Sequence, residues 1–246
     1  MKTLVVTGMN KTKEKKLMVF LNELIRIKDV IKWGVISSFG FLLSVSSLNP
    51  LKYLQPFLLF FVSTFGILSF TFAVNNYYDA DSDRNNPRRR NVNAIASGKI
   101  SRKKAAMLNG VLAIIPMVIC ASSGFTLLMF SMFLLFLMWI YSAPPIRLKG
   151  KPGLDILWHF SAFFLLVLWG SLFAGSVENI NLLTALSIGV FSCIGQIGNH
   201  VVDYKFDKES GTMTLAVKLG VEKTKKVLNT FTATHLLLLI PLLLFY

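Results

Sequence analysis

The sequence predicts an all-α integral membrane protein, a polytopic helical bundle with about seven transmembrane helices. Of its 246 residues, 54% are hydrophobic and only 15% are charged, whereas soluble proteins are about 25% charged. The apolar residues are gathered in runs close to the roughly 20 residues that a helix needs to cross a bilayer. This pattern excludes a soluble enzyme and a disordered chain, and the two cysteines, Cys120 and Cys193, exclude a disulfide scaffold.

Seven apolar runs are the candidates for membrane-spanning helices. The first, third and fourth are short, so they need a tilt or flanking basic side chains to span. Brief, almost uncharged turns follow the first, third and fifth runs, which predicts antiparallel neighbours there. The runs are residues 31–48, 54–74, 105–121, 125–142, 154–174, 182–202 and 228–246.

Residues 1–30 are predicted to form a cytoplasmic N-terminal arm ahead of the transmembrane bundle at 31–246. The apolar stretch Leu4-Val5-Val6 is too short for a secretory signal, and no small-residue cleavage site follows it. Residues 17–27, LMVFLNELIRI, are typical of a helix that lies on the membrane surface.

The basic residues predict the orientation of the bundle. They lie in the arm and in the loops at 79–104, 147–151 and 205–226, and only Lys52 of the 26 Lys and Arg residues lies at the opposite end. The positive-inside rule makes this basic side cytoplasmic. The net charge of +14 follows from the same bias. We therefore expect no nucleic-acid partner, because the interleaved aromatic residues that stack on bases are missing.

Two matching polar motifs lie where the second and sixth apolar runs reach the basic side. NNYYDADSD places Asn75, Asp79 and Asp83 four residues apart, and NHVVDYKFD repeats that spacing. If each helix continues through its motif, residues i, i+4 and i+8 lie on nearly one face. The members of the second motif are Asn199, Asp203 and Asp207.

The pairing of these motifs indicates a metal site. One acidic run alone is more simply a solvated helix end, but two in equivalent positions are not expected by chance. Carboxylates near a membrane core cost roughly 2.5–3.5 kcal/mol each at mid-helix, and four that converge repel one another unless a cation joins them. Hard oxygen ligands suit Mg²⁺ together with phosphate oxygens. We predict that Asp79, Asp83, Asp203 and Asp207, with Asn75, hold two Mg²⁺ ions around a diphosphate.

The basic loops beside the motifs offer charges for phosphate oxygens that the metals do not reach. Pro144-Pro145 ends the fourth helix, so that YSAPPIRLKG presents Arg147 and Lys149. Most of the other Lys and Arg residues are explained by the positive-inside rule alone. The predicted diphosphate-binding residues are Asn75, Asn199, Arg84, Arg147, Lys149 and Tyr141.

These motifs resemble those of the UbiA-type intramembrane prenyltransferase superfamily. NNYYDADSD is similar to its first aspartate-rich motif, NDxxDxxxD, with Asn76 in place of the first Asp. DYKFDKESG is similar to its second motif, DxxxDxxxG, through Asp203, Asp207 and Gly211. YSAPPIRLKG and TLAVKLG are also similar to family stretches, and the resemblance runs from about residue 26 to 226.

The resemblance implies transfer of a prenyl group from an allylic polyprenyl diphosphate, with its tail among the helices, to a lipophilic acceptor. The acceptors in the family include aromatic and quinone precursors and lipids. Metal ions stabilise the leaving diphosphate, and an apolar cavity protects the allylic carbocation from water. Aromatic ring faces would stabilise that cation. The candidates are Phe70, Phe72, Tyr77, Tyr78, Tyr141 and Trp158.

The chain also departs from the family pattern. The family usually has nine transmembrane helices, whereas this chain offers seven and stops in an apolar run, as a truncated or a naturally short member would. RRRNVNAIASG is longer and more basic than the usual RPxxSG. We expect Gly66 to face the prenyl tail, and the three histidines, His159, His200 and His235, to pack or form hydrogen bonds, with His200 the one candidate proton acceptor.

Three other functions remain open on the sequence. An ion-coupled membrane transporter would also carry acidic residues in its helices, often near mid-membrane breaks. The CDP-alcohol phosphotransferases use acidic helix ends too, but their DGxxAR motif is missing here. An inactive short homologue of the prenyltransferases is the third, although all four motif aspartates are present.

Overall fold

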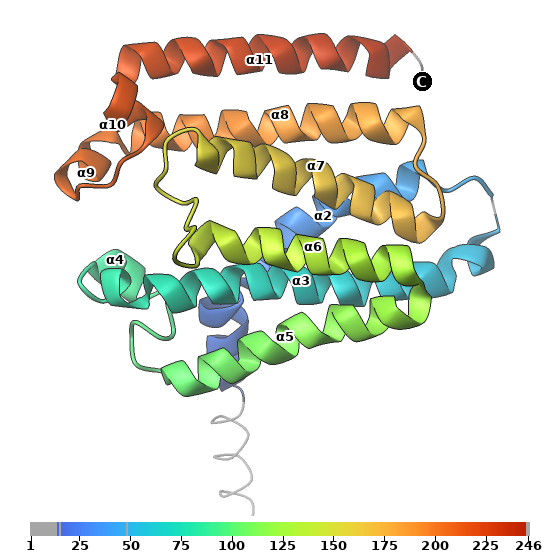
Figure 1. Cartoon of the computed structure of the whole chain (residues 1–246), viewed down its shortest axis with the longest axis horizontal. Coiled ribbons are helices and arrows are strands. Elements are labelled where there is room, and N and C mark those ends of the chain that lie inside the picture. Colours follow the sequence, from blue (N-terminus) through green and yellow to red (C-terminus); the bar gives the residue numbers. More distant parts are fainter. Residues whose placement is uncertain (1–13, 15, 48, 245–246) are drawn as a thin grey trace, which may run out of the picture.

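The computed structural model describes residues 14, 16–47 and 49–244, and this part of the chain is helical and contains no strand (Figure 1). Residues 1–13 of the predicted arm, with Leu4-Val5-Val6, lie outside the described residues. In chain order the elements are a π-helical turn η1 (Phe20–Leu24), α2 (Ile27–Leu43), α3 (Pro50–Arg84), α4 (Pro87–Arg90), α5 (Arg102–Ser123), α6 (Phe125–Ser142), α7 (Leu154–Ala174), α8 (Asn179–Val202), α9 (Tyr204–Glu209), α10 (Leu215–Leu219) and α11 (Val221–Leu244).

Six of the described helices are long and apolar enough to cross a membrane, by length and composition: α3, α5, α6, α7, α8 and α11. They confirm the all-α membrane bundle. The first predicted run, 31–48, differs, because α2 has only 17 residues and ends at Leu43. Its first two turns carry Lys28, Asp29 and Lys32, so the apolar part of this helix is shorter still.

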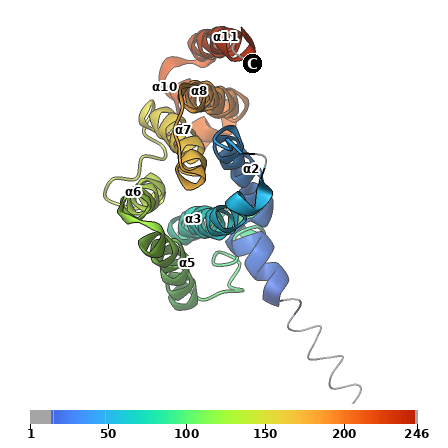
Figure 2. The same ribbon diagram turned by 90° about the vertical axis from the view of Figure 1, so that its right-hand side faces the viewer.

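The long helices lie side by side, and one end of the bundle collects the short helices α4, α9 and α10 (Figure 1). The chain leaves α3 and α8 and enters α7 at this same end. Seen along the bundle, α3, α5 and α6 form one group, and α8 and α11 lie on the opposite side (Figure 2). Between them, α2 contacts α3, α7 and α8. Both motifs therefore reach the same end of the molecule.

The α2–α7 pair packs at close range because small residues face one another. A Cβ atom at Gly40 would overlap the Val167 carbonyl group, and one at Gly170 would overlap the Ser37 carbonyl oxygen. Ser37 Oγ donates across the pair to the Leu166 carbonyl at 2.7 Å. Small residues let transmembrane helix backbones approach in this way, and this contact places α7 against α2.

The two motif-bearing helices end differently. Asn49 caps α3 and Pro50 occupies its first turn, and the helix then runs without interruption through the whole first motif to Arg84. In contrast, α8 ends at Val202, and Asp203 is the junction with the short α9. The prediction that the three polar residues of each motif share one face requires a continuous helix through the motif. The first motif meets this requirement, and the second does not.

The described end of the N-terminal arm belongs to the core. Leu24 and Ile25 are fully buried, and Arg26 takes a left-handed backbone conformation, with φ 55°, before α2 begins. Asn76 Nδ2 donates to the carbonyl groups of Glu23 and Leu24, both at 2.8 Å. An aspartate at position 76 has no N–H to donate, so the asparagine suits this contact. The placement of the arm on a membrane surface stays a prediction.

Candidate functional site

A cavity of about 810 Å³ lies among α2, α3, α6, α7 and α8, beside the first motif. Its wall contains Asn75, Asp79 and Asp83 of the first motif and Asn199 of the second. Side chains far apart in the sequence therefore meet around one space. Of the predicted site residues, Asn75, Asp79, Asp83, Tyr141, Lys149 and Asn199 line the cavity.

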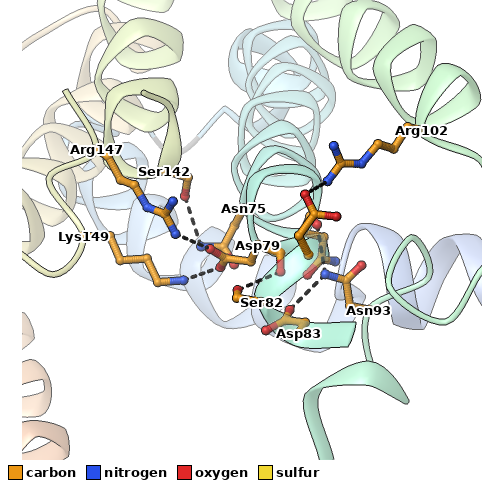
Figure 3. Close-up of polar contacts among 11 residues, drawn as sticks. Asn75, Asp79, Ser82, Asp83, Asn93, Arg102, Ser142, Arg147 and Lys149 are labelled. Carbon is orange, nitrogen blue, oxygen red and sulfur yellow. Dashed lines mark hydrogen bonds and ion pairs between the residues drawn. The ribbon is translucent and has the colours of Figure 1, made fainter. Parts of the chain in front are cut away.

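Asp79 is the most strongly paired residue of the site. Its side chain is 5% exposed, and the ammonium group of Lys149 forms an ion pair with its Oδ2 atom. Arg147 approaches the other carboxylate oxygen at 3.4 Å (Figure 3). Two cations compensate the desolvation of one buried carboxylate. Arg147 and Lys149, which the sequence predicts as diphosphate ligands, thus contact a predicted metal ligand.

The other two polar side chains of the first motif are also held in place. Asn75 Nδ2 donates to Ser142 Oγ at 3.1 Å, and Asp83 accepts from Asn93 Nδ2 at 2.9 Å (Figure 3). Asn93 is 1% exposed, and its Oδ1 accepts from the backbone N–H groups of Ile95 and Ala96. Asn93 was not among the predicted site residues, although a polar residue next to the apolar stretch Ala-Ile-Ala is a signal for a buried amide.

The second motif is more open. Asn199 and Asp203 are exposed, and Asp207 is 8% exposed. Neither of these aspartates lines the cavity. Burial raises the pKa of the Asp207 carboxyl group, and the charge of Asp203 adds to that rise. Arg84 is exposed and also lies outside the cavity wall.

The carboxylates of the two motifs do not converge on one point. Within the described ranges 14, 16–47 and 49–244, no three His, Cys, Asp or Glu side chains are grouped so that they could hold a metal ion. The chemistry of the donors nevertheless suits Mg²⁺, because all are hard oxygen ligands. Asn75 uses its amide nitrogen on Ser142, which leaves its Oδ1 atom for a cation. The assignment of these residues to the metal and the diphosphate stays a prediction.

Three of the predicted aromatic side chains, Phe72, Tyr141 and Trp158, line the cavity. Tyr141 stacks on Trp158 with ring centroids 4.0 Å apart, so two ring faces are fixed beside the first motif. The other candidates, Phe70, Tyr77 and Tyr78, lie outside the cavity wall.

A second, mostly apolar cavity of about 690 Å³ lies between α2, α7, α8 and α11. It shares wall residues with the first, among them Trp33, His159 and Gln196. Gly66 was expected to face a prenyl tail but lies elsewhere, since a Cβ atom there would meet Pro116 of α5 at 2.9 Å. The second cavity is lined by α2, α7, α8 and α11, whereas α3 packs this part of its surface on α5.

The three histidines differ in their partners and in the cavities that they line. His200 is 4% exposed, and its Nε2 lies 2.9 Å from Asp155 Oδ2, while His235 Nδ1 lies 3.1 Å from Ser187 Oγ. His200 lines neither cavity, but His159 lines both. Asp155 was not among the predicted site residues either, although a carboxylate in the first turn of an apolar helix is a signal for function.

Three basic side chains on the N-terminal side of the cavity were also missed. Arg26, Lys28 and Lys32 line it, and Arg26 Nε donates to Asp29 at 2.8 Å. In the sequence they differ in no way from the other basic residues of the arm, so they were assigned to topology alone.

Known proteins match both the sequence and the fold. The digeranylgeranylglyceryl phosphate synthase of Korarchaeum cryptofilum is 29% identical over 174 residues, which are 70% of this chain and 59% of that protein. The lycopene elongase/hydratase of Haloarcula japonica is 27% identical over 165 residues, 63% of this chain and 51% of that protein. The chain thus spans little more than half the length of these two relatives.

A solved structure of a UbiA homologue from Archaeoglobus fulgidus, bound to GPP and Mg²⁺, superposes with a TM-score of 0.78. The two chains are 22% identical, and the match covers 92% of this chain and 78% of that one. This likeness shows the fold of an integral membrane protein. The profile of the UbiA prenyltransferase family matches residues 34–246, and the chain therefore belongs to the UbiA prenyltransferase family.

Proposed function

We propose that this protein transfers a prenyl group from an allylic prenyl diphosphate to a membrane lipid acceptor in a Mg²⁺-dependent reaction. The observation that carries this proposal is the buried Asp79, paired with two cations in the wall of a large cavity. A transporter has no need of basic side chains gathered on one carboxylate at a helix end. The paired carboxylate and cations do suit a ligand that brings both a metal and phosphate groups.

The charges exchange partners when such a ligand binds. Asp79, Asp83 and Asn75 of the first motif would hold Mg²⁺ together with Asp203 and Asp207. Bound Mg²⁺ neutralises the diphosphate and stabilises it as a leaving group. Lys149 and Arg147, released from Asp79, then bind phosphate oxygens as charge-assisted donors.

The remaining walls suit the other parts of the substrate. Tyr141, Trp158 and Phe72 place ring faces beside the first motif, where they stabilise positive charge on the allylic carbon and exclude water. The apolar second cavity accommodates the tail between helices. Because the two cavities share wall residues, one extended molecule can occupy both.

For the acceptor we propose an anionic lipid. The relatives from Korarchaeum cryptofilum and Sulfolobus acidocaldarius are named for digeranylgeranylglyceryl phosphate, a glyceryl phosphate that carries two geranylgeranyl groups. Arg26, Lys28 and Lys32 supply further positive charge in the cavity wall. The phosphate of such a lipid would pair with these cations.

We also propose that the end bearing the motifs faces the cytoplasm, because the basic loops gather there. Cysteine substitutions at Ser97 and Ser210 of a protein otherwise lacking cysteine test this orientation. Labelling of both from the cytoplasmic side agrees with the proposal, and labelling exclusively from outside contradicts it.

The activity is tested with purified protein, Mg²⁺ and labelled prenyl diphosphates of several lengths. The acceptors are a monoalkyl glyceryl phosphate lipid and an aromatic acid. We expect Mg²⁺-dependent release of diphosphate and a labelled dialkyl lipid. Release without Mg²⁺, or a labelled aromatic acid as the main product, contradicts the proposal.

A further inference from the structure

One residue of the first motif is assigned to neither the metal nor the diphosphate. Asn76 stands where the family motif NDxxDxxxD has its first aspartate. It is 5% exposed, and its Nδ2 atom donates to the carbonyl groups of Glu23 and Leu24, each at 2.8 Å. An ionised carboxylate at this position could not donate to these oxygens and would be repelled by them. The asparagine therefore links α3 to the N-terminal arm.

Other contacts hold the same turn of the arm. The Glu23 carbonyl also accepts from the backbone N–H of Ala94 at 3.3 Å, and the Glu23 carboxylate forms an ion pair with Lys99 Nζ at 2.7 Å. Both partners belong to the loop that follows the first motif. The next two residues, Leu24 and Ile25, are fully buried. The turn is thus fixed against α3 and against this loop.

Arg26 follows this turn directly and carries backbone strain. Its φ of 55° is left-handed, and its carbonyl accepts from the N–H groups of Asp29 and Val30 at 2.8 and 3.2 Å, where α2 begins. A left-handed conformation is unfavourable for a residue with a side chain and persists where the surroundings hold it. Asn76 holds the two carbonyl groups ahead of this bend, so it helps to set the direction in which Arg26 leaves the arm.

The guanidinium group of Arg26 lies in the wall of the first cavity. Its Nε and Nη2 atoms contact Asp29 Oδ2 at 2.8 and 2.5 Å, and its central carbon lies 4.9 Å from the centroid of the Phe72 ring. All three residues line the cavity. No described residue accepts a hydrogen bond from Nη1 of Arg26. The guanidinium group is thus held in one place and keeps N–H donors for the oxygen atoms of a ligand.

This place differs from the position of Asp79. Phe72 precedes Asp79 by seven residues on the uninterrupted helix α3, which corresponds to about 10 Å of helix rise. Lys149 forms its ion pair at Asp79, whereas Arg26 lies over Phe72. A phosphate group bound by Arg26 is therefore a different group from one bound beside Asp79 and Lys149.

We propose that Asn76 is a positioning residue that holds Arg26 in place for the phosphate group of the lipid acceptor. Asn76 acts through the turn that precedes Arg26, and Arg26 binds the phosphate. The inference rests on the proposed function and adds the residue that binds the acceptor phosphate and the contact that places this residue. Lys28 and Lys32 line the same cavity and would keep a weaker attraction for the phosphate without Arg26.

The site predicts a preference that binding measurements detect without any reaction. The probes are a monoalkyl glyceryl phosphate lipid and the monoalkyl glycerol that lacks the phosphate. Each is titrated into the detergent-solubilised full chain without Mg²⁺ or prenyl diphosphate. We expect the wild type to bind the phosphate lipid about ten- to a hundredfold more tightly, as one charge-assisted contact provides. Equal binding of the two lipids overturns the inference.

A double-mutant cycle assigns the preference to the two residues. Arg26→Gln removes the charge, and Asn76→Ala removes both hydrogen bonds to the arm without adding a charge. We expect Arg26→Gln to lose most of the phosphate preference, Asn76→Ala to lose about tenfold, and the double variant to lose no more than Arg26→Gln alone. Asn85→Ala, an exposed asparagine at the end of the same helix, is the control and should keep the wild-type preference. Additive losses, or a wild-type preference in Asn76→Ala, contradict the inference.

A second variant covers the case in which Asn76→Ala does not fold. Asn76→Asp keeps the size of the side chain and carries the residue of the family motif, but it cannot donate to the two carbonyl groups. Its added charge repels a phosphate whether or not Arg26 is present, whereas a lost position acts only through Arg26. We expect Asn76→Asp to weaken the preference strongly in the wild-type background and little in the Arg26→Gln background. An equal loss in both backgrounds contradicts the inference.

Binding of inorganic diphosphate with Mg²⁺ separates the inference from the proposed function. Arg26→Gln should bind this ligand as the wild type does, and an equal weakening of diphosphate and phosphate lipid would place Arg26 at the diphosphate and overturn the inference. Failure of the wild type to bind a prenyl diphosphate with Mg²⁺ rejects the proposed function. A protein that binds the prenyl diphosphate, but whose phosphate preference does not depend on Asn76, rejects only the inference.

Discussion

The two aspartate motifs have the same spacing but different structural surroundings. The first lies on one uninterrupted helix, and its carboxylates are buried and paired with Lys149, Arg147 and Asn93. The second crosses the junction between α8 and α9, where Asp203 is exposed. If both motifs bind one ligand, as proposed, one half of the candidate site is thus preorganised, whereas the other half would have to move towards it when metal and diphosphate bind. Matched substitutions in the two motifs should therefore have unequal effects.

The largest loss is expected from Asp79→Asn. The change removes the carboxylate that two basic side chains compensate and that the proposal assigns to the metal. Changes next to metal ligands cost about 10- to 100-fold in metal affinity or activity, so loss of a ligand itself should reduce Mg²⁺-dependent turnover by about 100-fold or more. Turnover is measured as diphosphate release over a range of Mg²⁺ concentrations. Near-wild-type turnover at limiting Mg²⁺ would remove Asp79 from the site.

The equivalent change in the second motif, Asp203→Asn, should be milder and should depend on the metal concentration. Because Asp203 is exposed, the substitution leaves no buried charge unpaired, and thermal stability without ligand should stay at the wild-type value. We expect the Mg²⁺ concentration for half-maximal turnover to rise by about 10- to 100-fold. Equal requirements for Mg²⁺ in Asp203→Asn and the wild type would mean that the second motif takes no part.

Lys149→Ala tests phosphate binding separately from metal binding. One charge-assisted contact contributes about 1.5–3 kcal/mol, so binding of free diphosphate and of prenyl diphosphate should weaken by a similar factor of about ten to a hundred. The variant also releases Asp79 from its ion pair, so binding of Mg²⁺ alone should not weaken. Calorimetric titration of each ligand gives the comparison. Unchanged binding of both diphosphates would show that Lys149 is not part of the site and only contributes to the orientation of the protein in the membrane.

The smallest effect is expected from Asn93, the loop residue that holds Asp83 of the first motif in place. Asn93→Ala leaves Asp83 and two backbone N–H groups without their partner, which should lower the free energy of unfolding by about 1–3 kcal/mol. Asn91→Ala, an exposed position in the same loop, is the control and should stay within about 0.5 kcal/mol of the wild type. Thermal unfolding in detergent measures both. Equal melting temperatures for the two variants would show that the loop does not support the motif.

The sequence predicted best what depends on local pattern. The boundaries of α6 and α7 agree with the predicted runs 125–142 and 154–174, because glycine and proline interrupt the apolar pattern at these points. The shared helix face of Asn75, Asp79 and Asp83 was also predicted from local pattern, because it depends only on their four-residue spacing. The end of α8 inside the second motif was not, since nothing in NHVVDYKFD interrupts a helix, and the junction depends on how α9 and α10 pack.

The sequence did not predict which residues far apart along the chain contact one another. Asp155 and Gln196 lie 41 residues apart, and their contact exists only because α7 and α8 pack together. The cations on Asp79 come from a loop 68 and 70 residues away. The sequence showed that basic residues stand near the motifs, but the pairing of a particular cation with a particular carboxylate depends on the fold.

The central claim is that both motifs act on one Mg²⁺–diphosphate ligand, and a double-mutant cycle tests it most directly. Binding of inorganic diphosphate with Mg²⁺ is measured by calorimetry for the wild type, Asp79→Asn, Asp203→Asn and the double variant. Residues that share a ligand are coupled, whereas independent sites give additive losses to within about 0.5 kcal/mol. We predict that the double variant loses little more affinity than Asp79→Asn alone. Additive losses, or a loss confined to one motif, would contradict a shared site.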